Sequence, residues 1–286
     1  MTVNWERWPA LVGRGLLYAI CALILLFLVA PILVVIPLSF NAEPFFTFTP
    51  GMLRLDAQAY STRWYEVVLR DPVWLQSIRN SLLLAVLSTL LATTLGTMAA
   101  LGLNSARMPA KGLITSILIS PMIVPPIVAA TGMYFFYSRL DLTQTMTGLV
   151  VAHTLLGSPF VVVTVLATLS NFDGNLTRAA ATLGANPAQT FLKVVLPLIA
   201  PGVLSGAVFA FATSLDELIV VLFLGSVDQR TIPRQMWSGI RENVSPAILA
   251  MATILIAVSL TLMIALELLR RRADRRGASV SAPADE

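Results

Sequence analysis

The chain is short of charge. Only 12% of its 286 residues are Asp, Glu, Lys or Arg, whereas a soluble domain carries about 25%. Hydrophobic residues make up 57%, and the mean hydropathy is +0.81. This composition excludes a soluble globular enzyme and a disordered chain. The net charge is only +4 despite a pI near 9.6, and most positive residues lie at the edges of apolar runs, which argues against a nucleic-acid binder.

The chain is also short of reactive side chains. It has one cysteine, Cys21, and one histidine, His153, which cannot form a disulfide within the chain or a metal site built on Cys and His. Neither of its two lysines, Lys111 and Lys193, lies in a G-x-x-x-x-G-K-[ST] phosphate-binding loop. The motifs G-x-S-x-G and H-E-x-x-H are absent as well. We therefore expect no catalytic residue, no metal site and no cofactor in this chain.

Long apolar runs are what the sequence has in abundance. A helix needs about 20 apolar residues to cross the roughly 30 Å hydrocarbon core of a bilayer. Six runs are long enough, and they predict an all-α integral membrane protein with six transmembrane helices. The runs are 16–40, 77–102, 112–137, 147–169, 198–224 and 247–269.

Positive charge predicts the orientation of these helices. Most of the 19 Lys and Arg residues precede the first run, separate the second from the third or the fourth from the fifth, or follow the sixth. Cytoplasmic loops carry this excess, so we expect both termini to be cytoplasmic. The predicted organisation is then a cytoplasmic N-terminus, a first helix, an extracytoplasmic loop, a five-helix core and a basic cytoplasmic tail. Their ranges are 1–15, 16–40, 41–76, 77–269 and 270–286.

Two features predict how the helices are used. The first run is too long for the 7–15-residue core of a signal peptide, so we interpret it as a retained anchor rather than a cleaved segment. Pro121, Pro125 and Pro126 break the third run, and a broken helix in a membrane must face protein or a water-filled cavity.

The second run carries small side chains three or four positions apart along one face. This pattern favours close helix packing, either within the chain or at a subunit interface. The residues are Ser88, Thr89, Ala92, Thr93, Gly96, Thr97 and Ala100.

The most informative segment is 171–197, between the fourth and fifth runs. It predicts two short helices. Asp173 or Asn175 can cap the first, and Gly184 can end it in the left-handed conformation. Asn186 then caps the second, with Pro187 at its first position, and we expect Pro197 to end it. A rigid helix pair with one apolar face suits insertion into a groove of another protein.

This segment resembles the "EAA" loop of the permeases of binding-protein-dependent ABC importers. The matching positions are Ala179, Ala180, Leu183, Gly184 and Ala185, followed by Val195, Leu196, Pro197, Pro201 and Gly202. The likeness extends over most of the chain, and Ser214-Leu-Asp-Glu217 with Val244-Ser-Pro246 is similar to the second permease of spermidine/putrescine-type importers. The resemblance implies the MetI-like fold of type I importers and a multi-pass protein of the bacterial inner membrane.

The resemblance also implies partners. In this family the loop, here called the coupling loop (171–197), docks on a cytoplasmic ATPase, which binds the ATP and Mg²⁺. A second, homologous permease, two copies of the ATPase and an extracytoplasmic substrate-binding protein complete the importer, which works by alternating access. Arg178 stands where the family has a glutamate. Either the groove of the ATPase is complementary in charge to this arginine, or the alanine and glycine positions of the loop are sufficient for docking and the charge is incidental.

Asp216 and Glu217 lie in the fifth run, where a charge at the bilayer centre costs about 2.5–3.5 kcal/mol. One hypothesis is that at least one of them, with Ser214, lines the path of a cationic substrate such as a polyamine. The other is that they are structural acids, hydrogen-bonded or protonated in place. As neighbours on a helix they would point about 100° apart and could not share a proton.

Other functions leave some residues unexplained. A secondary transporter using Asp216 or Glu217 as its proton carrier would have no use for the coupling loop. An intramembrane enzyme would need a pair of reacting groups in facing spans, and this sequence has no such pair. Within the importer class, iron, phosphonates and thiamine-like cations are alternative substrates.

Overall fold

The computed structural model describes residues 8–105, 107–170, 172–242 and 245–280. Asn171, Val244 and the outer parts of both predicted terminal segments therefore lie outside the described residues. Every secondary-structure element in the described ranges is a helix. The chain divides into two units, one of residues 1–70 and 239–256 and one of residues 71–238 and 257–286, which we describe separately.

The first unit contains α1 (Trp8–Leu38) and the segment that follows it. Short helices fold this segment: α2 (Pro50–Leu53), η2 (Ala57–Ala59) and α3 (Arg63–Arg70). Asn41 ties the start of this segment to α3, because its buried side-chain amide donates to the carbonyls of Phe45 and Thr47 and its backbone carbonyl accepts from the Trp64 indole at 2.7 Å. The predicted loop 41–76 is thus an ordered structure.

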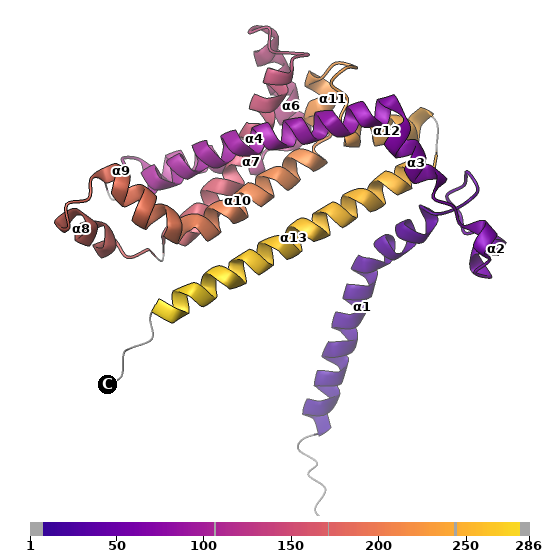
Figure 1. Cartoon of the computed structure of the whole chain (residues 1–286), viewed down its shortest axis with the longest axis horizontal. Coiled ribbons are helices and arrows are strands. Elements are labelled where there is room, and N and C mark those ends of the chain that lie inside the picture. The colour runs from indigo at the N-terminus through magenta and orange to yellow at the C-terminus, as the bar shows by residue number, and fades with distance from the viewer. Residues whose placement is uncertain (1–7, 106, 171, 243–244, 281–286) are drawn as a thin grey trace, which may run out of the picture. The chain divides into compact units, whose positions relative to one another are not determined.

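The second unit is built on α4 (Pro72–Asn104), α7 (Met146–Leu169) and α10 (Leu196–Asp216), which pack on one another and lie side by side in Figure 1. Glycines allow the close approach. A Cβ on Gly206 of α10 would lie 2.6 Å from the Thr164 hydroxyl of α7, and one on Gly96 of α4 would lie 2.7 Å from Val161 of α7. The small-residue face of α4 is therefore used for packing within the chain, as Ala92 in the core of the three helices also indicates.

The third predicted span is broken, as its prolines predict. α5 (Lys111–Ile119) and η3 (Ser120–Met122) meet α6 (Pro126–Ser138) at a bend of 101°. Among the described residues, five further helices are long and apolar enough to cross a membrane, and the bent pair, counted as one span, brings the number to six. α6 packs with α7 and with α11 (Ile219–Leu224) around a second apolar core.

The last elements are α12 (Ile232–Glu242) and α13 (Ala247–Val280). Just before α13, the Ser245 hydroxyl accepts a hydrogen bond from the Ala247 N–H at 3.3 Å, and Pro246 lies between them.

The fifth span differs from the prediction. Pro197 does not end the second short helix of the coupling loop. Instead α9 (Pro187–Thr190), the π-helical turn η4 (Phe191–Val195) and α10 form one helix from Pro187 to Asp216. Proline lacks the N–H that would bond the carbonyl four residues earlier, and the wider turn just before Pro197 accommodates this loss. The helix stops at Asp216, within the predicted span.

Candidate coupling loop and translocation path

The first helix of the coupling loop, α8 (Asn175–Thr182), ends on a glycine, as predicted. Gly184 has φ +83°, in the left-handed region. Its N–H donates to the Ala181 carbonyl, and the Ala185 N–H donates to the Ala180 carbonyl, both at 3.0 Å. This pair of bonds is a Schellman motif, which satisfies carbonyls that the helix end leaves free. At the start, the prediction that Asp173 or Asn175 is the cap residue is wrong, because Gly174 occupies the N-cap position; the Asp173 carboxylate accepts from the Asn175 N–H at 2.9 Å just before it.

The second helix begins with a capping box. The Asn186 side chain accepts from the Gln189 N–H at 2.8 Å, and the Gln189 side chain accepts from the Asn186 N–H at 3.1 Å. Pro187 occupies the first helical position, where no N–H is needed. The turn between the two helices is therefore fixed by hydrogen bonds on both sides.

The coupling loop joins an exposed tip to a buried root. At the tip, the Leu183 side chain is 88% exposed, and Arg178 and Ala179 are exposed with it. At the root, Phe191 and Val195 pack into the core of α4, α7 and α10. Leu196 and the exposed Pro197 continue directly into α10, and Leu196 packs on the same core. The exposed tip is thus connected, through the turn at Asn186, to a continuous helix whose first turns pack into the core.

Ser214 lies in a buried polar cluster near the other end of α10. Its hydroxyl lies 2.8 Å from Nδ1 of His153 on α7 and accepts from the Ser88 hydroxyl on α4 at 3.1 Å. All three side chains are buried, and Nε2 of His153 has no hydrogen-bond partner among the described residues. One polar cluster therefore ties the three long helices of the unit together.

The two acids have separate environments. Asp216 is the last residue of α10 and is exposed. Glu217 lies outside the helix, in an extended conformation with φ −71° and ψ 119°. Its carboxylate accepts from the Val220 N–H of α11 at 2.9 Å. The expected 100° separation of two helical neighbours is therefore wrong, because the span breaks between the two residues and Glu217 caps the second half.

The predicted site residues thus form two groups at opposite ends of one helix. Arg178, Ala179, Ala180, Leu183, Gly184, Ala185, Leu196 and Pro197 belong to the coupling end, and Ser214, Asp216 and Glu217 to the other. The roles of His153 and Ser88 could not be found from sequence, because their contacts with Ser214 join residues 61 and 126 positions apart. Among the described residues, no three His, Cys, Asp or Glu side chains gather as a metal site would require.

Comparison with known proteins finds the same family that the motif in the coupling loop indicates. The family model described as "Binding-protein-dependent transport system inner membrane component" matches residues 92–276. The spermidine/putrescine transport system permease protein PotC of Escherichia coli K12 is 32% identical over 261 residues, covering 91% of this chain and 96% of PotC. The putrescine transport system permease protein PotI of the same strain is 30% identical over 258 residues, covering 87% and 89%.

Solved structures agree on the fold. A chain of the bacterial alginate ABC transporter, in complex with its pentasaccharide-bound periplasmic protein, superposes with a TM-score of 0.68 at 15% identity and covers 93% of this chain and 96% of its own. A chain of the methionine ABC transporter MetNI in an inward-facing conformation gives 0.59 at 18% identity, covering 74% and 99%.

Proposed function

The chain belongs to the family of inner membrane components of binding-protein-dependent transport systems, and we propose that it forms half of the path by which a polyamine enters the cell. It is a permease subunit of an ABC importer in the inner membrane, and it is not an enzyme. The proposed substrates are putrescine and spermidine, which are named in the descriptions of PotC and PotI.

The observation that carries the substrate class is the position of Asp216. Its exposed carboxylate is at the C-terminal end of α10, where the helix dipole adds partial negative charge. The sequence of α10 contains no Lys or Arg to neutralise it. A carboxylate at the end of a discontinuous membrane helix is suited to an ammonium group. Ser214 and Glu217 would support this path by holding the helix end and capping α11.

The coupling loop is proposed to dock on a separate cytoplasmic ATPase. The rigid turn presents Leu183 as an apolar side chain that a groove can bury, and Arg178 is exposed on α8 as well. ATP and Mg²⁺ would be bound by two copies of that ATPase, and no cofactor by this chain. A second, homologous permease and an extracytoplasmic binding protein, which delivers the substrate, would complete the assembly.

The continuous helix offers a mechanism for alternating access. From Pro187 to Asp216 it has 30 residues, or roughly 45 Å at 1.5 Å per residue. Closure of the two ATPases would move the coupling loop, and the packed root at Phe191 and Val195 would pass this movement to α10. Asp216 at the far end would then move relative to α11, because the chain is not helical at Glu217.

The test is uptake of labelled putrescine and spermidine by cells that have no other polyamine importer. Cells with the gene should take up the label, and cells without it, or with the Ala179–Gly184 segment deleted, should not. Membrane insertion of the deletion variant is checked by immunoblot of the membrane fraction. Uptake that is the same with and without the gene would refute the polyamine proposal, and competition with iron, phosphonate and thiamine would then identify the substrate class.

A further inference from the structure

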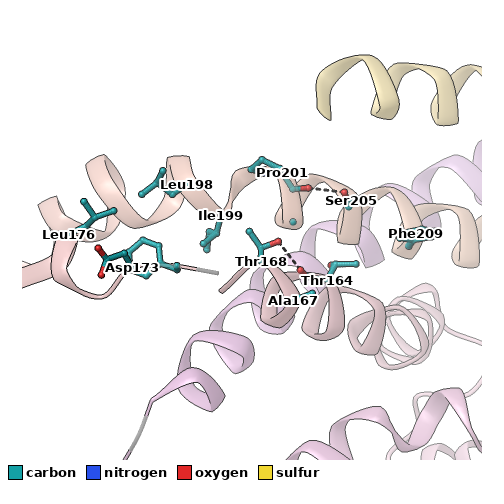
Figure 2. Close-up of a pocket in the computed structure, with 12 residues that line it drawn as sticks. Thr164, Ala167, Thr168, Asp173, Leu176, Leu198, Ile199, Pro201, Ser205 and Phe209 are labelled. Atoms are coloured by element: carbon teal, nitrogen blue, oxygen red, sulfur yellow. Dashed lines mark hydrogen bonds between the residues drawn. The ribbon is translucent and has the colours of Figure 1, made fainter. Parts of the chain in front are cut away.

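A pocket of about 730 Å³ lies between α7 and α10 close to the coupling loop. Figure 2 shows Asp173 at one end of this pocket and Phe209 at the other, with α7 and α10 on its two sides. The volume lies within the range of about 300–1,000 Å³ that is usual for small-molecule sites. The proposed path at Asp216 does not include any residue of this pocket.

The polar groups of the pocket are hydrogen-bond acceptors. The hydroxyls of Thr164, Thr168 and Ser205 each donate to a carbonyl of their own helix, at 2.8 to 3.0 Å. A hydroxyl has one proton and two lone pairs, but the Thr164 and Thr168 hydroxyls lie against Gly206 and Gly202 of α10, which leaves the Ser205 hydroxyl as the acceptor for a ligand. The Asp173 carboxylate accepts from the Asn175 N–H through Oδ1, which leaves Oδ2 available.

The rest of the lining favours a cation. No Lys or Arg is among the twelve lining residues, so a positive ligand meets no like charge there. Phe209, which is stacked on Phe160 with ring centroids 6.2 Å apart, presents an aromatic ring at the end opposite the carboxylate. Aromatic faces attract organic ammonium groups, and an alkylammonium group carries only donors for the acceptors on the walls.

We propose that this pocket binds an organic ammonium ion on the coupling-loop side of the permease. It would be a second binding site for the substrate, which the substrate reaches after Asp216. Both sites include residues of α10, and Ser205 and Asp216 are eleven residues apart, or roughly 16 Å. The inference rests on the proposed function for the identity of the ligand, which would be one end of a putrescine or spermidine molecule.

The test measures protection of a cysteine in the pocket. The complete importer is placed in nanodiscs, and Cys21→Ser removes the native thiol of this chain. Ala167→Cys then places a thiol in the pocket, and Ser138→Cys places one at an exposed position at the end of α6 as the control. Spermidine should slow the reaction of N-ethylmaleimide with Ala167→Cys and leave that of Ser138→Cys unchanged. 1,6-Hexanediol, which is uncharged and intermediate in length between putrescine and spermidine, should not protect.

A charge variant makes the test specific. Asp173→Asn keeps an oxygen for the Asn175 N–H and removes the charge, so about tenfold more spermidine should be needed for half-protection. Asp141→Asn, in the turn between α6 and α7, is the matched control and should change nothing. Equal labelling with and without spermidine, or equal protection by hexanediol, would overturn the inference. So would an Ala167→Cys thiol that does not react at all, because another subunit or a lipid would then fill the pocket.

Uptake of labelled spermidine by the same importer, measured with its binding protein, separates the two proposals. Uptake without protection would refute the binding of spermidine in this pocket and leave the proposed function unaffected. Protection without uptake would support an ammonium site and refute the proposed function.

Discussion

The hydroxyl of Ser214 on α10 lies 2.8 Å from Nδ1 of His153 on α7, two residues before α10 ends at Asp216. Both side chains are buried. The contact therefore fixes the end of the helix that carries the proposed substrate carboxylate. It also gives the only histidine of the chain a structural role.

The first prediction concerns this contact. Ser214→Ala leaves Nδ1 of His153 buried without a partner, which costs about 1–3 kcal/mol. We expect a lower midpoint of thermal unfolding for the purified importer, measured by tryptophan fluorescence. Ser138→Ala is the control, because that exposed hydroxyl also bonds a helix carbonyl but joins no second helix. Equal midpoints for the two variants would show that the cluster contributes nothing to stability.

The second prediction concerns the crossing of α7 and α10. A Cβ on Gly202 would overlap the Thr168 hydroxyl and lie 3.0 Å from the Thr164 carbonyl. Gly202→Ala must therefore push the helices apart, at a cost of about 1–3 kcal/mol. A Cβ on Gly132 of α6 would have no atom within 4 Å, so Gly132→Ala should be neutral or slightly stabilising, because glycine is less favourable than alanine inside a helix. Thermal unfolding of both variants is the measurement, and a Gly202→Ala variant as stable as Gly132→Ala would contradict the packing.

Local signals in the sequence were sufficient where neighbouring residues decide the structure. Asn186 and Pro187 start a helix, and Gly184 ends one, through bonds between residues three to five positions apart. The same holds for the bend at Pro125 and Pro126. In each case the residue type restricts its own backbone or satisfies a nearby helix end, so no knowledge of the fold is needed.

Local signals failed in the fifth span. The apolar run continues on both sides of Asp216 and Glu217, so it predicts one helix. It cannot reveal the break between these two residues, after which the Glu217 carboxylate caps the start of α11. Pro197 indicates a helix end, but the π-helical turn before it keeps the helix continuous. The contact between Ser214 and His153 depends on the packing of two distant helices, and no pattern in a single sequence predicts it.

The third prediction separates the two acids. Asp216→Asn removes the exposed charge that we propose meets the substrate, so the KM for spermidine uptake should rise about tenfold. Glu217→Gln retains a side-chain oxygen for the Val220 N–H, so the KM should stay nearly unchanged. Uptake by proteoliposomes containing the importer and supplied with the binding protein gives both constants. A larger effect at Glu217 than at Asp216 would reverse the assigned roles.

The fourth prediction tests the arginine of the coupling loop. Arg178 is exposed, so replacing it should not affect folding. If the partner's groove is complementary in charge, Arg178→Glu should weaken binding of the ATPase more than Arg178→Ala does, and the difference should shrink as salt is added. We expect this result. Equal binding of both variants at low salt would show instead that the alanine and glycine positions of the loop are sufficient for docking and that the charge has no part in it.

The fifth prediction concerns the tip of the coupling loop. Leu183 is 88% exposed, the highest exposure of any large hydrophobic side chain among the described residues. Leu183→Ala should leave the unfolding midpoint of the isolated permease unchanged, because the side chain contributes little to the core. Affinity for the ATPase should fall about tenfold, as for a side chain worth 1–2 kcal/mol at an interface, and uptake should fall with it. Leu140→Ala, at an exposed position after α6, is the matched control. If Leu183→Ala binds the ATPase as the control does, Leu183 is not a docking residue, and the contact must lie elsewhere on the coupling loop.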